Sequence, residues 1–149
     1  MVRFSGMSVA EADGFRAGAL DAYGNVPERQ VSGGDAPCRC CLRMIPDGEA
    51  MLVLAYRPFS AVQPYAETGP VFLHAAPCAP DGAPEMLTSP DYLLKGYSAD
   101  ERIVYGTGKV TPREEAEAYA AEVLSRADIA FVDLRSARNN CWLARITRG

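Results

Sequence analysis

Histidine, lysine and tryptophan are scarce in this chain of 149 residues, and long apolar runs are missing. It has one histidine, two lysines and one tryptophan. The longest uninterrupted apolar run, residues 50–56, is far shorter than the about 20 residues of a membrane-spanning helix. Basic residues (15) do not outnumber acidic ones (19), so the chain lacks the basic excess typical of nucleic-acid-binding domains. Neither a membrane nor a nucleic acid is therefore expected as a partner.

The overall composition is that of an ordinary globular protein. Apolar residues make up 48% of the chain and charged residues 23%, which excludes disorder over most of the length and any fibrous repeat. No linker is long enough to divide the chain, so a single domain is expected over residues 1–149.

The first 15 residues carry acids where a signal peptide would be apolar, and this predicts a cytoplasmic location. In a reducing compartment cysteines are expected to be reduced, metal-bound or catalytic, and an odd number of them agrees with that expectation. The five cysteines are Cys38, Cys40, Cys41, Cys78 and Cys141.

Local signals predict two helices among short strands. Ser8 and Glu11 form a capping box that opens a helix to about Leu20. Thr111 as N-cap with Pro112 after it opens a second helix, whose apolar face comprises Ala116, Tyr119, Ala120, Val123 and Ala127. Strands are predicted at residues 2–6, 51–56, 70–75, 92–97, 102–107, 129–134 and 142–147, with loops at 23–35 and 77–90.

The patterns also predict where some of these strands lie. The first is expected at a sheet edge, residues 51–56 at a sheet centre, residues 92–107 as a hairpin, and the last strand half-exposed. The order of elements predicts an α+β fold, with a mainly antiparallel sheet and two helices packed on one face.

Cys38 and Cys41 form a Cys-x-x-Cys pair, a spacing that lets two thiolates reach one zinc ion. His74 with Cys78, or Cys141, could supply further ligands. Because no second Cys-x-x-Cys and no His-x-x-x-His closes the set, inert buried thiols are the favoured interpretation, and no stoichiometric zinc and no cofactor are expected. A redox pair or a thiol nucleophile stays open as an alternative.

His74 is the only imidazole, so any acid–base chemistry of histidine must use it. A catalytic thiol, Cys38 or Cys141, would need His74 within hydrogen-bond reach. Whether the protein is an enzyme stays open.

Three arginines, Arg39, Arg57 and Arg135, stand beside apolar stretches and could grip an anionic ligand. The alternative is an internal salt bridge to a carboxylate, for which Glu49, Glu67 and Asp133 are available.

Several short motifs resemble a known family. They are Pro37-Cys38-Arg39, Gly48-Glu49, Pro64-Tyr65, Gly69-Pro70-Val71-Phe72-Leu73-His74, Gly96-Tyr97 and Ala137-Arg138-Asn139-Asn140-Cys141. Together they resemble the bacterial family known as domain of unknown function 1203, over nearly the whole chain.

The resemblance carries no activity, but it places six residues in recurring motifs: Cys38, Arg39, Tyr65, His74, Arg135 and Cys141. It also implies that position 41 is not always cysteine among relatives. Many relatives resemble His-Val-Arg where this chain has Asp133-Leu134-Arg135, so a mechanism with two histidines is not expected here.

The leading functional hypothesis is a domain that binds a small molecule or anion. Arg39, His74 and Arg135 would line its pocket near Tyr65. One alternative is a thiol enzyme or redox site that uses Cys38 or Cys141 with His74. The other is a structural module stabilised by a metal at Cys38, Cys41 and Cys78. The sequence leaves the oligomeric state open, a homodimer included.

Overall fold

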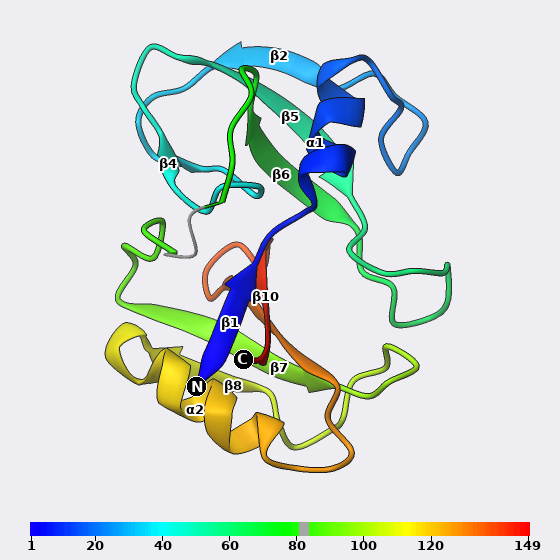
Figure 1. Ribbon diagram of the computed structural model, residues 1–149, viewed down its shortest axis with the longest axis vertical. Helices are drawn as coiled ribbons and strands as arrows, with labels where there is room; N and C mark the ends of the chain where they lie inside the picture. Colours follow the sequence, from blue (N-terminus) through cyan, green and yellow to red (C-terminus); the bar gives the residue numbers. More distant parts are fainter. Residues whose placement is uncertain (81–83) are drawn as a thin grey trace. The chain divides into compact units, whose positions relative to one another are not determined.

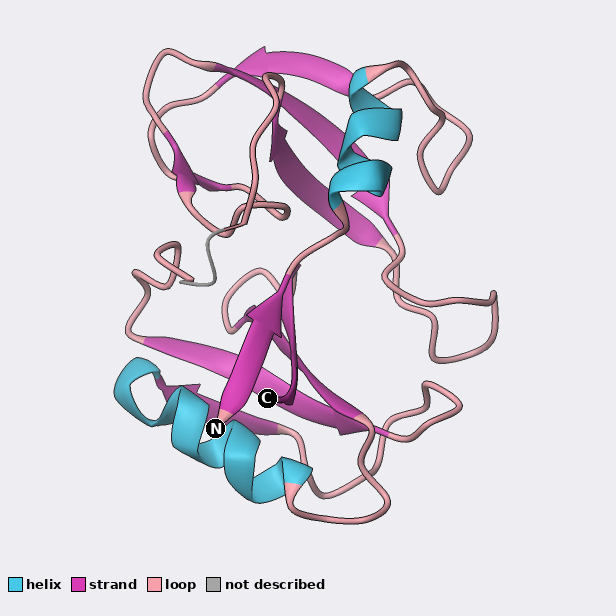
Figure 2. Ribbon diagram, viewed as in Figure 1, coloured by secondary structure: helices cyan, strands magenta, loops and turns pink. Residues whose placement is uncertain are grey.

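The computed structural model describes residues 1–80 and 84–149, which form two compact units. One unit comprises Met1–Phe4, Phe59–Ala66 and Leu87–Gly149, and the other comprises Ser5–Pro58 and Glu67–Met86. Each holds one helix and mostly antiparallel strands, which confirms the α+β class (Figure 2). The expectation of a single domain stays a prediction.

The first unit, called here the five-stranded unit, is built on a sheet with the strand order β1-β10-β9-β7-β8. The strands are β1 (Val2–Ser5), β7 (Asp91–Tyr97), β8 (Lys109–Pro112), β9 (Phe131–Ser136) and β10 (Trp142–Arg148). Helix α2 (Ala116–Leu124) contacts four of them and buries Ala116, Ala120, Val123 and Leu124. The predicted edge position of the first strand is confirmed.

The second unit, called here the three-stranded unit, has the strand order β2-β5-β6. Its strands are β2 (Glu28–Val31), β5 (Ala50–Tyr56) and β6 (Gly69–His74), and a separate pair joins β3 (Ala36–Pro37) to β4 (Met44–Ile45). Helix α1 (Val9–Arg16) belongs to this unit (Figure 1). The nearly continuous apolar run of β5 lies at the centre of its sheet, as predicted, and most of its side chains are buried.

Helix α1 begins as predicted, with both bonds of the Ser8–Glu11 capping box present. It ends at Arg16 rather than near Leu20. Gly18 adopts a φ of +99°, a left-handed conformation that glycine tolerates and that stops a helix. Its backbone N–H donates to the carbonyl oxygen of Phe15 at 3.1 Å.

Two predictions in the region of β7 and β8 were wrong. Residues 102–107 form no strand apart from one bridge between Ile103 and Tyr97, and β7 pairs with β8 instead. Thr111 and Pro112 belong to β8, where Thr111 lies opposite Tyr92, so Thr111 does not cap the helix. A 3₁₀ turn, Arg113–Glu115, precedes α2. The pairing of Thr111 in the sheet prevailed over its local capping signal.

The predicted loop at residues 23–35 contains β2, whose four residues are all exposed. Such a strand shows no apolar alternation, and it forms because β5 offers a free edge for pairing. The last strand is more buried than predicted, because β10 lies between β1 and β9 and buries Leu143 as well as Trp142.

The predicted irregular segment 77–90 includes residues 81–83, which lie outside the described residues. Among the residues that are described, no helix is both long and apolar enough to cross a bilayer.

Candidate metal centre

A tight turn of residues 38–42, called here the cysteine turn, joins β3 to β4 and carries the Cys-x-x-Cys pair. The backbone N–H of Leu42 donates to the carbonyl oxygen of Cys38 at 3.0 Å, and that of Cys38 donates to Arg43 at 2.9 Å. Leu42 adopts a φ of +62°, which is strained for a branched side chain. The buried Leu42 side chain and these bonds hold the turn closed.

Strand β6 brings the only histidine to this turn. A parallel bridge pairs Cys38 with Phe72, and the backbone N–H of Arg39 donates to the carbonyl oxygen of Phe72 at 3.0 Å. His74 follows two residues later, at the end of β6, and its backbone N–H donates to Cys38 Sγ at 3.5 Å. The sheet register therefore fixes His74 beside the cysteine turn.

Four side chains meet here, and together they are called the Cys3His cluster: Cys38, Cys41, His74 and Cys78. Their ligand atoms all lie within 4.8 Å of one another. Cys38 Sγ is 3.8 Å from Cys78 Sγ, and Cys41 Sγ is 3.5 Å from His74 Nδ1. Cys38 and Cys41 are fully buried, whereas His74 and Cys78 are partly exposed.

The thiols of the cluster differ in acidity. The Cys41 thiol donates to Cys38 and lowers the pKa of Cys38, and backbone N–H groups, among them that of His74, lower it further against the effect of burial. The same contact, followed by burial, raises the pKa of Cys41 to about 12. Burial, with Cys78 close by, also raises the pKa of the neighbouring Cys40 to about 12. Cys38 is thus the thiol that is most readily ionised among the three.

Arg16, at the last position of α1, reaches the cluster from another part of the unit. Its Nη2 donates to Cys78 Sγ at 3.1 Å, and its Nε donates to the carbonyl oxygen of His74 at 3.0 Å. Its Nη1 pairs with Asp13 at 2.9 Å. No signal in the sequence singles out Arg16, because a basic residue in the last turn of a helix is common.

The residues predicted to line an anion pocket fall in both units. Arg39 lies in the three-stranded unit, buried, where its Nη1 donates to the carbonyl oxygen of Pro37 at 2.7 Å and its guanidinium lies over the ring of Phe72. Arg135 and Tyr65 lie in the five-stranded unit. The anion pocket of Arg39, His74 and Arg135 stays a prediction.

In the five-stranded unit these two residues have local partners. Buried Arg135 donates from Nε to Asn140 Oδ1 at 3.1 Å, and the hydroxyl of Tyr65 lies 3.0 Å from that of Tyr105. Cys141 also belongs to this unit, and its thiol contacts the carbonyl oxygen of Asn139.

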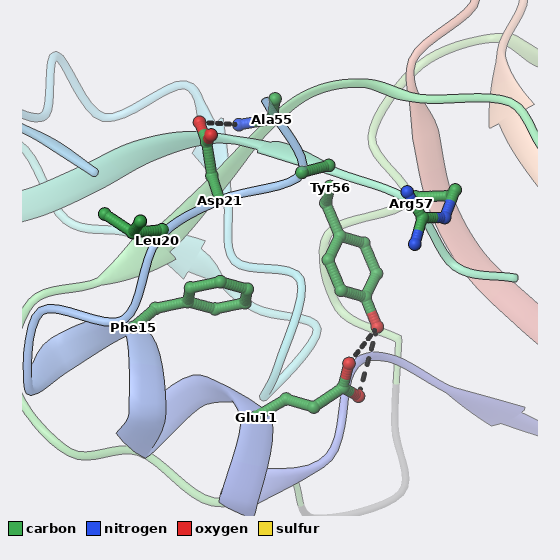
Figure 3. Close-up of a pocket in the computed structure, with 8 residues that line it drawn as sticks. Glu11, Phe15, Leu20, Asp21, Ala55, Tyr56 and Arg57 are labelled. Carbon is green, nitrogen blue, oxygen red and sulfur yellow. Dashed lines mark hydrogen bonds between the residues drawn. The ribbon is translucent and has the colours of Figure 1, made fainter. Parts of the chain in front are cut away.

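A separate hollow of about 240 Å³ lies between α1 and β5 (Figure 3). Its carboxylates are engaged in internal bonds: Glu11 accepts from the hydroxyl of Tyr56 at 3.1 Å, and Asp21 accepts from the backbone N–H of Ala55 at 3.0 Å. Arg57, one of the arginines singled out in the sequence, lines the same hollow. These bonds fasten α1 and the segment after it to β5.

The fold and the cluster define the class of protein: an α+β protein in which three cysteines and one histidine meet within one unit. Residues 35–148 match the family described as "Protein of unknown function (DUF1203)". Because the match covers more than half of the chain, the protein belongs to this family, and the resemblance seen in the sequence is confirmed. No curated protein and no solved structure matches the chain significantly.

Proposed function

We propose that the three-stranded unit binds one zinc ion through the Cys3His cluster, and that the protein is a metal-stabilised module. The observation that carries this proposal is the convergence of four ligand atoms within 4.8 Å. The sequence alone predicted no stoichiometric zinc because the ligand set was open. The proximity of His74 and Cys78 to the Cys-x-x-Cys pair supports a complete set of four ligands, so we propose a zinc ion in place of that expectation.

The separations agree with tetrahedral coordination. With Zn–S bonds of about 2.3 Å and a Zn–N bond of about 2.0–2.1 Å, two sulfur ligands lie about 3.8 Å apart, and a sulfur and a nitrogen about 3.6 Å apart. Cys38 and Cys78 are 3.8 Å apart at sulfur, and Cys41 and His74 are 3.5 Å apart at Sγ and Nδ1. These two pairs are opposite edges of one tetrahedron. Only modest movement of the remaining pairs is needed to admit the ion.

The donor set favours a structural ion over a catalytic one. A structural zinc site is closed by four protein ligands, whereas a catalytic site keeps one position for water or substrate. Three thiolates and one imidazole fill all four positions. The ion would join the cysteine turn, the end of β6 and the segment at Cys78, of which the last belongs to no helix or strand.

The test is the metal content of the protein purified without chelators under reducing conditions. We expect about one zinc per chain by elemental analysis, lost in Cys38→Ser and Cys78→Ser. Cys40→Ala, which changes a buried thiol of the same turn, and Cys141→Ser, in the other unit, are the matched controls and should keep the ion. Cobalt added in place of zinc should give the absorption bands of tetrahedral cobalt with thiolate ligands.

A wild-type protein that holds no metal as purified and takes up neither zinc nor cobalt after reduction would overturn the proposal. This outcome does not depend on whether any variant folds. Loss of zinc in Cys141→Ser to the same extent as in Cys78→Ser would also contradict it. If wild-type Cys38 or Cys41 instead reacts rapidly with an alkylating reagent and no metal is present, the thiol-enzyme alternative gains support.

A further inference from the structure

We propose that Arg16 is a positioning residue of the metal centre, and that metal binding and the docking of α1 are therefore coupled. This inference rests on the proposed zinc site. It goes further because it assigns a role to a helix that precedes residue 35, where the family match begins.

The first observation is the geometry of the guanidinium. Arg16 contacts two of the four ligand residues, through the sulfur of Cys78 at 3.1 Å and the main-chain oxygen of His74 at 3.0 Å. Its side chain is only 8% exposed, whereas the carboxylate of its ion-pair partner Asp13 is 58% exposed. The cation is thus directed at the cluster and held there by three separate bonds.

The second argument is the charge that the site would carry with zinc bound. A Zn²⁺ ion with three thiolates and a neutral imidazole carries a net charge of −1. A nearly buried guanidinium requires a negative partner, and a metal-bound thiolate can accept a hydrogen bond from outside its coordination shell. Arg16, which is paired with Asp13 through Nη1, already donates from Nη2 to Cys78 Sγ, and this bond would become stronger on a metal-bound thiolate.

The third observation is that the chain entering α1 also touches the cysteine turn. The backbone N–H of Met7 donates to the carbonyl oxygen of Arg39 at 2.8 Å. Gly6 packs so closely there that a Cβ atom on it would overlap the same oxygen. The segment from Gly6 to Arg16 therefore contacts the metal-binding elements at both ends. Metal that orders the turn and Cys78 also orders the surfaces on which α1 docks.

The experiment measures zinc affinity by competition with a chromophoric chelator in four full-length proteins: wild type, Arg16→Gln, Arg16→Lys and Arg29→Gln. Loss of a residue that supports a metal ligand typically weakens affinity about 10–100-fold. We expect that loss in Arg16→Gln and a smaller loss in Arg16→Lys, which keeps the charge. Arg29→Gln, an exposed arginine on β2, should match wild type.

One further readout distinguishes positioning from a general loss of stability, and a second tests the coupling of α1 to the metal. In the cobalt-loaded proteins, the sulfur-to-cobalt charge-transfer band should shift in Arg16→Gln and not in Arg29→Gln. In wild type, removal of zinc should raise amide hydrogen exchange in α1, because coupling between two sites is reciprocal. This last measurement needs no variant.

Equal zinc affinity in wild type and Arg16→Gln, within about twofold, would overturn the inference and leave the zinc proposal intact. Exchange of α1 amides that is unchanged when zinc is removed would overturn it as well. A wild-type protein that binds no metal would instead refute the zinc site itself, so the two failures are distinguishable.

Discussion

At the scale of single residues, arginine supplies the positive charge that is buried in the interior. Thirteen of the 15 basic residues are arginine, and two of them, Arg39 and Arg135, are buried. A planar guanidinium can bind both oxygens of one carboxylate and stack flat on a ring, which the compact ammonium group of lysine cannot do. Arg145 shows both properties: it donates to both carboxylate oxygens of Asp133, at 2.8 and 3.1 Å, and lies over the ring of Phe131. Asp133 is fully buried.

We expect Arg145→Ala to lower the free energy of unfolding by about 3–5 kcal/mol, the usual loss when one partner of a buried ion pair is removed. Burial raises the pKa of Asp133, and Arg145 opposes that rise. Without Arg145 the pKa rises further, so the deficit is largest at neutral pH. It decreases as the pH falls through the folded-state pKa and the carboxyl takes up a proton.

Urea unfolding at successive pH values measures this, and the fluorescence of Trp142, the only tryptophan, reports on the same unit. Arg138→Ala is the matched control. Its exposed pair with Asp91, at 3.1 Å, should be worth less than about 1 kcal/mol. Adding Asp133→Asn to Arg145→Ala should restore part of the loss. Similar deficits for Arg145→Ala and Arg138→Ala, or a deficit that does not change with pH, would contradict this account.

At the scale of elements, α1 is a short helix that depends on its surroundings. Eight residues form no stable helix alone in water, and only Ala12 is buried on it. Its capping box starts it. The Glu11–Tyr56 bonds (Figure 3) and the Arg16–Cys78 bond attach it to the rest of the unit. Phe15 adds an edge-to-face contact with Tyr56 at 6.3 Å. Close approach of the chain at Gly6 completes the attachment.

Two glycines in this region should respond to alanine with opposite signs. Gly6→Ala places a methyl group on the carbonyl oxygen of Arg39 and should destabilise the three-stranded unit by about 1–3 kcal/mol, the range for overpacking. Gly14 lies inside α1, where a Cβ would meet only Ala19 at 3.9 Å. Gly14→Ala should stabilise by about 0.5–1 kcal/mol through its higher helix propensity. Thermal unfolding of both variants tests this, and effects of the same sign would refute it.

At the scale of the whole molecule, the division into two units determines which part of the chain the proposed zinc ion would stabilise. All four residues of the Cys3His cluster lie in the three-stranded unit. The five-stranded unit has instead an aromatic core, with Tyr97 stacked on Phe131 at 5.1 Å and tilted against Phe59 at 5.5 Å. A zinc ion bound as proposed would stabilise the three-stranded unit and not the five-stranded unit.

Removal of zinc by a chelator should consequently destabilise the three-stranded unit more than the five-stranded unit. We expect hydrogen exchange to increase in β5, β6 and the cysteine turn, and to change much less in β7, β9 and β10. The reason is that a ligand bound only by the folded form stabilises the part whose folding creates its site. Readdition of zinc should restore protection, whereas magnesium should not, because thiolates are poor ligands for it. Equal deprotection of both units would contradict this prediction.

The sequence by itself determined the elements whose signals are local. The apolar run of β5 predicted a central strand, because a strand covered on both faces excludes polar residues. The capping box of α1 and most of the face of α2 were also readable, since each depends on residues three or four apart. Ala127, predicted on that face, lies beyond the end of α2 and is exposed, and Leu124 is buried instead. The sequence did not predict the exposed strand β2 or the pairing of Thr111, because both depend on a partner strand distant in sequence.

The candidate site shows the same limit. Both halves of the Cys3His cluster are visible in the sequence, as Cys-x-x-Cys at 38–41 and His-x-x-x-Cys at 74–78. Each spacing suits a metal, yet neither motif indicates that the two lie close together in the folded protein. The bridge between Cys38 and Phe72 brings His74 to the turn, and α1 brings Arg16. Spacing along the chain fixes which ligands one turn can offer, and only tertiary pairing decides which turns share an ion.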